Sequence, residues 1–188
     1  MSVVPALPTP ATRASAAAAC LLGLHRLLPV LACLLLAHCQ RGPSHWHYHY
    51  QPGKTALLVR GKAVPPAGLP AVVMRAINAG NRIVGKPYRY GGGHQRIEDR
   101  GYDCSGTVSY VLYHAGLLHS PATSTGFMRY GHAGAGRHLT VYSEKGHCFI
   151  EVAGLRLDTG YHGGREGPQW TTRSRPIRGY VLRHPRGY

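Results

Sequence analysis

Apolar residues in the segment 101–118 recur with the period of an α-helix. The residues that share the i, i+3, i+4, i+7 spacing are Val108, Val111, Leu112 and Ala115. This spacing places them on one face of a helix, where they can be buried together. Asp103 is a favourable N-cap residue, so the pattern predicts a helix that begins at Cys104.

Residues 146–160 alternate with the period of a β-strand and predict a hairpin. One face is expected to carry His147, Phe149 and Glu151, and the other Cys148, Ile150 and Val152. If Ala153 and Gly154 form a two-residue turn, Asp158 lies opposite Phe149, on the face of His147. A three-residue loop would turn Asp158 to the other face.

Weaker patterns predict the remaining elements. They are an apolar helix from about Leu69 to Val84, a short strand at Thr55–Val59, a strand and turn in HLTVYSEKG at 138–146, and a closing strand from about Arg178 to Arg183. The expected fold class is therefore α+β, with N-terminal helices packed on an antiparallel β-sheet.

The N-terminal segment has the pattern of an export signal. Residues 1–26 are rich in Ala and Pro, and the run LLPVLACLLLA follows at 27–37. Eleven apolar residues suit the core of a signal peptide and are too few to span a bilayer. We expect a signal peptide at 1–38, a linker at 39–66 and one domain at 67–188. Cys39 is either a lipidated residue that anchors the protein or lies near an ordinary cleavage site, because His38 is not the small residue that lipoprotein processing favours.

The charge of the chain predicts an anionic partner. The 188 residues carry a formal charge of +15, and removal of residues 1–38 leaves 20 basic and 7 acidic residues, or +13. The basic residues are scattered through expected loops and no nucleic-acid motif accompanies them, so nucleic acid is not expected as a partner. Export makes an anionic cell wall or membrane surface the expected partner, in the periplasm or cell envelope. We expect a monomer.

Cysteine usage argues against a disulfide framework. Of the five cysteines, at most Cys39, Cys104 and Cys148 remain after export. Cys148 is expected to be a small core residue. A bridge between Cys104 and Cys148 is not expected, because the strand pattern points Cys148 away from the face of His147.

The predicted start of the helix at Cys104 suits a nucleophile. Unpaired backbone N–H groups and the positive end of the helix dipole lower the pKa of a thiol there. The alternative is a small buried residue at a helix start. His147 is the candidate base and Asp158 the candidate group that orients it, with His162 in reserve. Glu151 lies about 13 Å along the strand from His147, too far to orient it.

The run HWHYHY at 45–50 could place three imidazoles along one edge of an extended segment. Neighbours two residues apart could share a metal ion, but the outer pair, His45 and His49, would lie about 13 Å apart. Two alternatives remain for this run. It is either a metal site with two imidazoles and no evident third ligand, or a linker segment without a binding role. We predict no metal and no cofactor.

Three motifs together carry a family resemblance. DCSG opens the predicted helix, GH opens a strand some forty residues later, and YRYGGG lies upstream. Over roughly residues 69–183 the chain resembles the NlpC/p60-like family of papain-fold cell-wall cysteine peptidases. The resemblance implies a papain-like NlpC-type fold, with Cys104 as nucleophile and His147 as base. Asp158 matches the third position, where His, Asn or Gln is commoner in the family.

The resemblance also implies substrate-binding residues. Tyr88 is the tyrosine that helps form the site, and Tyr90 stands where Trp is commoner. Asp103 and Ser105 match residues that in some members bind the free amine of the stem peptide, although capping of the helix explains Asp103 equally well. Gly106 is expected to let the histidine strand approach closely.

The implied activity is hydrolysis of amide bonds in peptidoglycan stem peptides by an exported Cys-His-Asp peptidase. The bond between D-glutamate and the diamino acid is the expected target. Two alternatives remain open. One is an amidase or acyltransferase of the same fold, and the other is a noncatalytic basic lipoprotein that binds the envelope.

Overall fold

A six-stranded antiparallel sheet is the centre of the computed structural model, which describes residues 43–160 and 166–188. Its strand order is β4-β10-β5-β6-β7-β8. The bounds are β4 His132–Ala133, β5 Leu139–Glu144, β6 His147–Val152, β7 Leu155–Asp158, β8 Gln169–Thr171 and β10 Val181–His184. The expected signal peptide, Cys39 and His162 lie outside the described residues.

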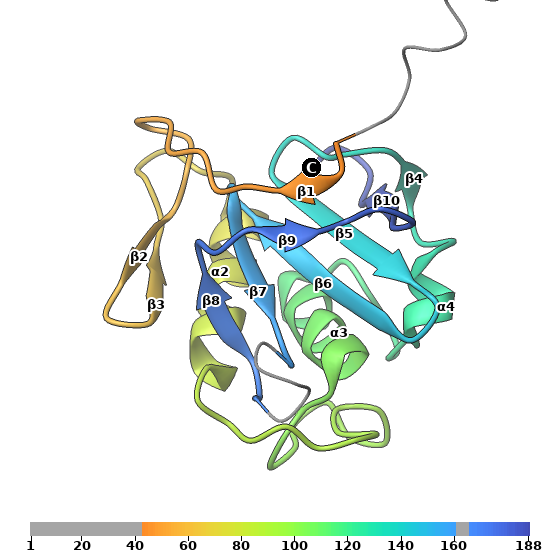
Figure 1. Ribbon diagram of the computed structural model, residues 1–188. Coiled ribbons are helices and arrows are strands. Elements are labelled where there is room, and N and C mark those ends of the chain that lie inside the picture. The colour runs from red at the N-terminus through yellow and green to blue at the C-terminus, as the bar shows by residue number, and fades with distance from the viewer. Residues whose placement is uncertain (1–42, 161–165) are drawn as a thin grey trace, which may run out of the picture. The chain divides into compact units, whose positions relative to one another are not determined.

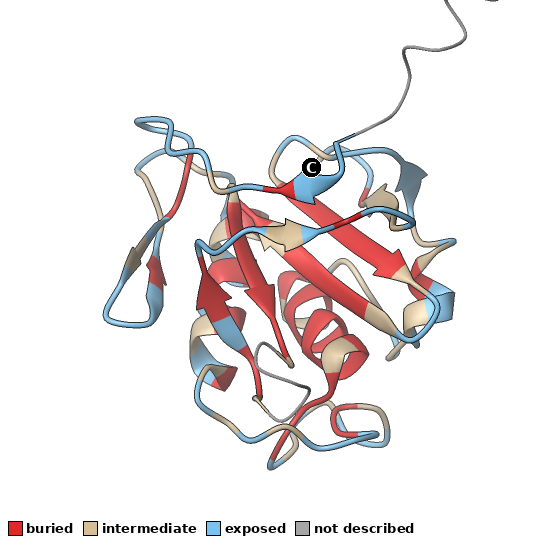
Figure 2. Cartoon of the chain, in the orientation of Figure 1, coloured by how far each residue is buried: buried red, intermediate tan, exposed pale blue. Residues whose placement is uncertain are grey.

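Two longer helices cover one face of this sheet (Figure 1). They are α2 at Ala71–Ile83 and α3 at Cys104–Ala115, followed by the short α4 at Ser124–Phe127. Both α2 and α3 lie where the apolar spacing predicts them. Figure 2 shows that α3 and the strands β5 to β7 are mostly buried, so the main core lies between the helices and the sheet. The described residues thus form an α+β architecture.

The β6–β7 hairpin has the register expected for a two-residue turn. Val152 pairs with Leu155, and Ile150 pairs with Leu157. Ala153 and Gly154, with φ of 48° and 73°, form the turn. Two consecutive positive φ values are typical of the type I′ turn, whose twist matches that of antiparallel strands. This register puts Asp158 on the face of His147.

Two short strands cross the other face of the sheet (Figure 1). They are β1 at His45–Trp46 and β9 at Arg175–Pro176, which pair with each other. Trp46 is 4% exposed and packs in a second apolar cluster, whose other buried members are Tyr142, Phe149 and Ile177.

Residues 45–64, within the linker expected at 39–66, contain the short strand expected at Thr55–Val59 and further elements. After β1, the strands β2 at Leu57–Val59 and β3 at Lys62–Val64 form a hairpin. Ala56 and Ala63 belong to the main core. The sequence pattern gives little sign of this packing because each buried stretch is only one or two residues long. None of the helices in the described ranges is long and apolar enough to cross a membrane.

Candidate active site

The structure brings Cys104, His147 and Asp158 together from three elements. Cys104 is the first residue of α3, His147 the first of β6, and Asp158 the last of β7. Nε2 of His147 donates a hydrogen bond of 2.9 Å to Oδ1 of Asp158. Cys104 is the other side chain that acts on His147 and raises its pKa. Because Nε2 is engaged by Asp158, Nδ1 is the ring nitrogen left for the sulfur.

The environment of Cys104 favours its thiolate and lowers the pKa of the thiol to about 4. The largest cause is a hydrogen bond from the side chain of Cys148. Burial acts in the opposite direction, while the hydrogen bond and charge of His147 and the backbone N–H of Cys148 lower the pKa further. The groups that lower this pKa therefore lie on β6, whereas the sequence argument relied on the helix start.

The environment of His147 favours the imidazolium and raises its pKa to about 9. Burial lowers this pKa, but the hydrogen bonds to Asp158 and Cys104 and the charge of Asp158 outweigh burial. At neutral pH the two groups therefore form a thiolate–imidazolium pair, which is the reactive form of a nucleophilic cysteine.

Asp158 is fully buried and held by two cationic side chains. Nη1 of Arg175, from β9, donates a hydrogen bond of 3.0 Å to Oδ2. Nε of Arg156 lies 3.7 Å from the same oxygen, and the N–H of Thr159 donates a hydrogen bond of 2.8 Å to Oδ1. Burial lowers the pKa of Arg175, but the charge of Asp158 outweighs it and the net shift is upward. This network fixes the carboxylate that orients His147.

Sequence reasoning missed Arg175. Arg175 lies 17 residues after Asp158 in the sequence and donates a hydrogen bond to it. It belongs to β9, a strand of two residues whose other member is Pro176. A strand this short leaves no recognisable period. Only the pairing of β9 with β1 would have placed the arginine over the sheet.

Cys148 corrects one expectation. It faces away from His147 as the alternation predicts, and it is fully buried in the main core. It does not point away from Cys104, because α3 covers the face of the sheet to which Cys148 belongs, and Cys104 packs against the same core. Both cysteines are free thiols.

Tyr88 lies close to Cys104. It forms a β-bridge with Tyr102, next to the N-cap of α3. Burial raises the pKa of its hydroxyl, and the charges of Cys104 and Asp103 raise it further. Tyr90, in contrast, is 91% exposed.

Asp103 caps α3 as predicted. Its Oδ1 accepts hydrogen bonds from the N–H of Gly106 at 2.7 Å and from the hydroxyl of Ser105 at 3.2 Å. Its Oδ2 accepts the N–H of Gly91 at 3.0 Å. Asp103 therefore joins the glycine-rich loop at 91–93 to the start of the helix.

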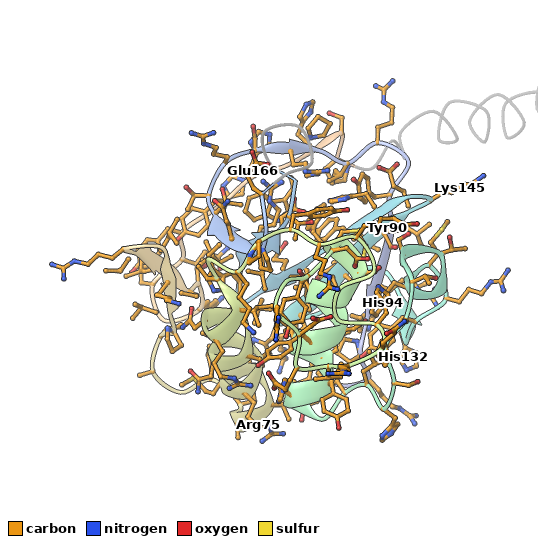
Figure 3. The ribbon with its side chains drawn as sticks, turned by 90° about the horizontal axis from the view of Figure 1, so that it is seen from below. Arg75, Tyr90, His94, His132, Lys145 and Glu166 are labelled. Atoms are coloured by element: carbon orange, nitrogen blue, oxygen red, sulfur yellow. The ribbon has the colours of Figure 1, made fainter. Side chains whose placement is uncertain are left out.

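His94 also contacts this cap and was not expected from the sequence. Its Nε2 lies 3.1 Å from Oδ1 of Asp103 and 3.0 Å from Oγ of Ser105. Figure 3 labels His94 and Tyr90, which both belong to the loop between α2 and α3. The side-chain oxygens of Asp103 and Ser105, which are expected to bind the substrate, are therefore both in contact with the imidazole of His94.

Gly106 has a different role from the expected one. A Cβ atom at this position would lie 1.9 Å from the carbonyl oxygen of Gly92. The absent side chain therefore lets the glycine-rich loop, and not the histidine strand, approach the helix.

The remaining candidates take no part in the triad. Glu151 accepts hydrogen bonds from Trp46 at 2.7 Å and from Tyr142 at 3.0 Å, so it does not orient His147. The rings of His45, His47 and His49 follow one another at 6.0 and 6.4 Å. Within residues 43–160 and 166–188, no group of three metal-ligating side chains is found.

Neither a family model nor a curated protein matches the sequence.

Proposed function

We propose that this protein is an NlpC/p60-type cysteine peptidase of papain-like fold that hydrolyses an amide bond in peptidoglycan stem peptides. The observation that carries the proposal is the convergence of Cys104, His147 and Asp158, in which His147 is hydrogen-bonded to Asp158 and the surroundings lower the pKa of the thiol and raise that of the imidazole. A helix that begins with the cysteine, packed on antiparallel strands that carry the histidine and the acid, also fits this family.

The geometry supports covalent catalysis in two steps. The Cys104 thiolate attacks the substrate carbonyl carbon, and the His147 imidazolium gives its proton to the leaving amine. The neutral His147 then takes a proton from water, whose oxygen adds to the thioester carbonyl carbon. The carboxylic acid is released, the sulfur leaves as a thiolate, and the thiolate–imidazolium pair is restored. Asp158 keeps the ring in place through both steps.

The oxyanion formed in each step would be stabilised at the start of α3. The N–H of Cys104 has no partner within the helix, because the first N–H groups of any helix lack one. Such a donor typically contributes about 10²-fold to 10³-fold in rate. Tyr88 would help to form this site. Asp103 and Ser105 would contact the substrate, and a substrate amine would compete with His94 for their oxygens.

The proposed location is the periplasm or cell envelope, where an export signal would deliver the protein. A formal charge of +13 on residues 39–188 suits an anionic cell wall or membrane surface. The preferred bond, by family resemblance, joins D-glutamate to the diamino acid.

Mass spectrometry of peptidoglycan fragments tests the proposal. The protein and its Cys104→Ala variant are incubated with purified peptidoglycan, with His132→Ala, at an exposed histidine, as a control. New peptide fragments from the protein and the control, and none from Cys104→Ala, are expected. Separation of whole peptides from the sugar would instead indicate an amidase. The absence of fragments, together with envelope binding that survives Cys104→Ala, would contradict the proposal and favour a binding protein.

A further inference from the structure

A cavity of about 620 Å³ lies at the end of the sheet where β6 turns into β7. Its walls come from three segments, at 47–55, 137–138 and 151–154. His147 begins β6 and Asp158 ends β7, so the triad lies at the other end of these two strands. Pockets that bind small molecules measure about 300–1,000 Å³. The cavity therefore has the size of a ligand site and is separate from the triad.

Backbone hydrogen bonds hold the three segments of the cavity together. The N–H of Ala153, in the β6–β7 turn, donates to the carbonyl of His138 at 2.7 Å, and its own carbonyl accepts the N–H of Ala56 at 2.8 Å. The segment between β1 and β2 therefore passes over this end of the sheet (Figure 1). The hydroxyl of Thr55 donates to the carbonyl of His49 at 3.2 Å. These walls are in place before a ligand arrives, which reduces the entropy lost on binding.

Nitrogen donors dominate the side chains that line the cavity. They are His47, His49, Lys54, Arg137 and His138. The rings of His47 and His49 follow one another, with centroids 6.4 Å apart. Within residues 43–160 and 166–188, no hydrogen bond or ion pair engages the charged group of Lys54 or Arg137. Burial and the charge of Arg137 lower the pKa of His138, so its imidazole is neutral at pH 7 and keeps one N–H donor.

The net charge of the cavity lining is positive. Glu151 is the one acid among the described lining residues, and its Oε2 already accepts hydrogen bonds from Trp46 at 2.7 Å and from Tyr142 at 3.0 Å. Lys54 and Arg137 contribute +2 against −1 from Glu151, which leaves +1 even with every imidazole neutral. This lining favours an anion over a cation as the ligand.

We propose that this cavity binds the phosphate group of a phosphate-bearing polymer of the envelope. A phosphate presents several acceptor oxygens to donors from different directions, and a guanidinium and an ammonium suit it. A carboxylate has only two oxygens and would leave part of these donors unused. The volume also has room for a sugar or glycerol beside the phosphate. The envelope source rests on the proposed location, whereas phosphate binding is a property of the protein alone.

The test is a titration of the ¹⁵N-labelled protein with glycerol 3-phosphate, followed by the amide shifts in nuclear magnetic resonance spectra. Glycerol and acetate, at the same ionic strength, are the matched probes without a phosphate. We expect saturable shifts with glycerol 3-phosphate at the amides of Thr55, Ala153 and Gly154, which line the cavity. Glycerol is expected to cause none, and acetate to bind more weakly.

Two arginines separate the cavity from the general charge of the surface. Arg137→Ala is expected to weaken binding by about tenfold, because a charge-assisted contact is lost. Arg137→Lys keeps the charge without the planar fork and is expected to lie between. Arg129→Ala removes the same charge at an exposed side chain that does not line the cavity, and it should leave the affinity unchanged. Arg137 is exposed as well, so its variants are expected to fold.

Three results would overturn the proposal. They are no saturable shift with glycerol 3-phosphate, equal binding of acetate, and equal losses in Arg137→Ala and Arg129→Ala. Vesicles of phosphatidylglycerol distinguish the source of the phosphate: binding to them without binding of glycerol 3-phosphate would indicate a membrane surface and also overturn it. All titrations omit peptidoglycan, and Cys104→Ala should bind glycerol 3-phosphate unchanged. Failure of the inference and failure of the proposed function are therefore distinguishable.

Discussion

Cys104 and His147 carry opposite charges over a wide pH range, which sets the pH dependence expected of catalysis. Below about pH 4 the thiolate is protonated and the nucleophile is lost. Above about pH 9 the imidazolium loses the proton that the leaving amine needs. We expect kcat/KM to be bell-shaped with limbs near these two values. A profile with a single rising limb near the ordinary pKa of a thiol would contradict the ion pair.

Asp158 is the residue whose charge most directly supports His147. In Asp158→Asn the carboxylate charge that raises the pKa of His147 is lost, so this pKa falls and the upper limb moves to lower pH. We expect kcat to fall on the order of 10²-fold to 10⁴-fold. The measurement is the pH–rate profile, with Asp99→Asn as the control because Asp99 lies outside the triad. An unmoved upper limb would argue against Asp158 as the orienting group.

The three triad residues could be predicted because each depends on a local pattern. The helix period and its N-cap place Cys104, and strand alternation places His147. The two-residue turn at Ala153 and Gly154 fixes the face of Asp158. The contacts of Arg175 and Cys148 could not be predicted, since they depend on how separate elements pack.

At the scale of the element, the start of α3 depends on its fit against the glycine-rich loop. A Cβ at Gly106 would overlap the carbonyl of Gly92, and a backbone atom cannot move aside as a side chain can. We expect Gly106→Ala to destabilise the protein by about 1–3 kcal/mol, despite the higher helix propensity of alanine.

Denaturant unfolding measures this effect, with Gly126→Ala in α4 as the matched control. A Cβ at Gly126 would meet its nearest neighbours at 3.5 Å, an ordinary contact. If Gly106→Ala and Gly126→Ala were equally stable, the close approach of the 91–93 loop to α3 would not limit the size of residue 106.

Elements with several periods of pattern were predicted well, and most strands of two or three residues were not. The helices α2 and α3 and the strands β5 to β7 repeat their apolar spacing often enough to be recognised. The closing strand, expected from about Arg178 to Arg183, lies at Val181–His184. The two-residue strands β1 and β9 are fixed by their pairing and have no pattern of their own.

In the folded domain as a whole, the sheet has an apolar face under the helices and a mixed face under β1 and β9. The mixed face buries the charged residues Arg156 and Asp158, and the guanidinium of Arg156 lies over the rings of Trp46 and Phe149. Buried charges are tolerated where they are paired and hydrogen-bonded. The second layer therefore helps to bury Arg156 and Asp158.

Trp46 tests whether this layer stabilises the domain. Its indole N–H donates to Glu151, its ring contacts the guanidinium of Arg156, and it is almost fully buried. We expect Trp46→Ala to lower the free energy of unfolding by about 3–5 kcal/mol. Tyr50→Ala, at a side chain that is 53% exposed, should change it by less than about 0.5 kcal/mol. Because β1 pairs with β9 and β9 carries Arg175, the loss of Trp46 should also loosen the contact between Arg175 and Asp158. If Trp46→Ala and Tyr50→Ala were equally stable, residues 45–64 would not stabilise the domain and would be a linker.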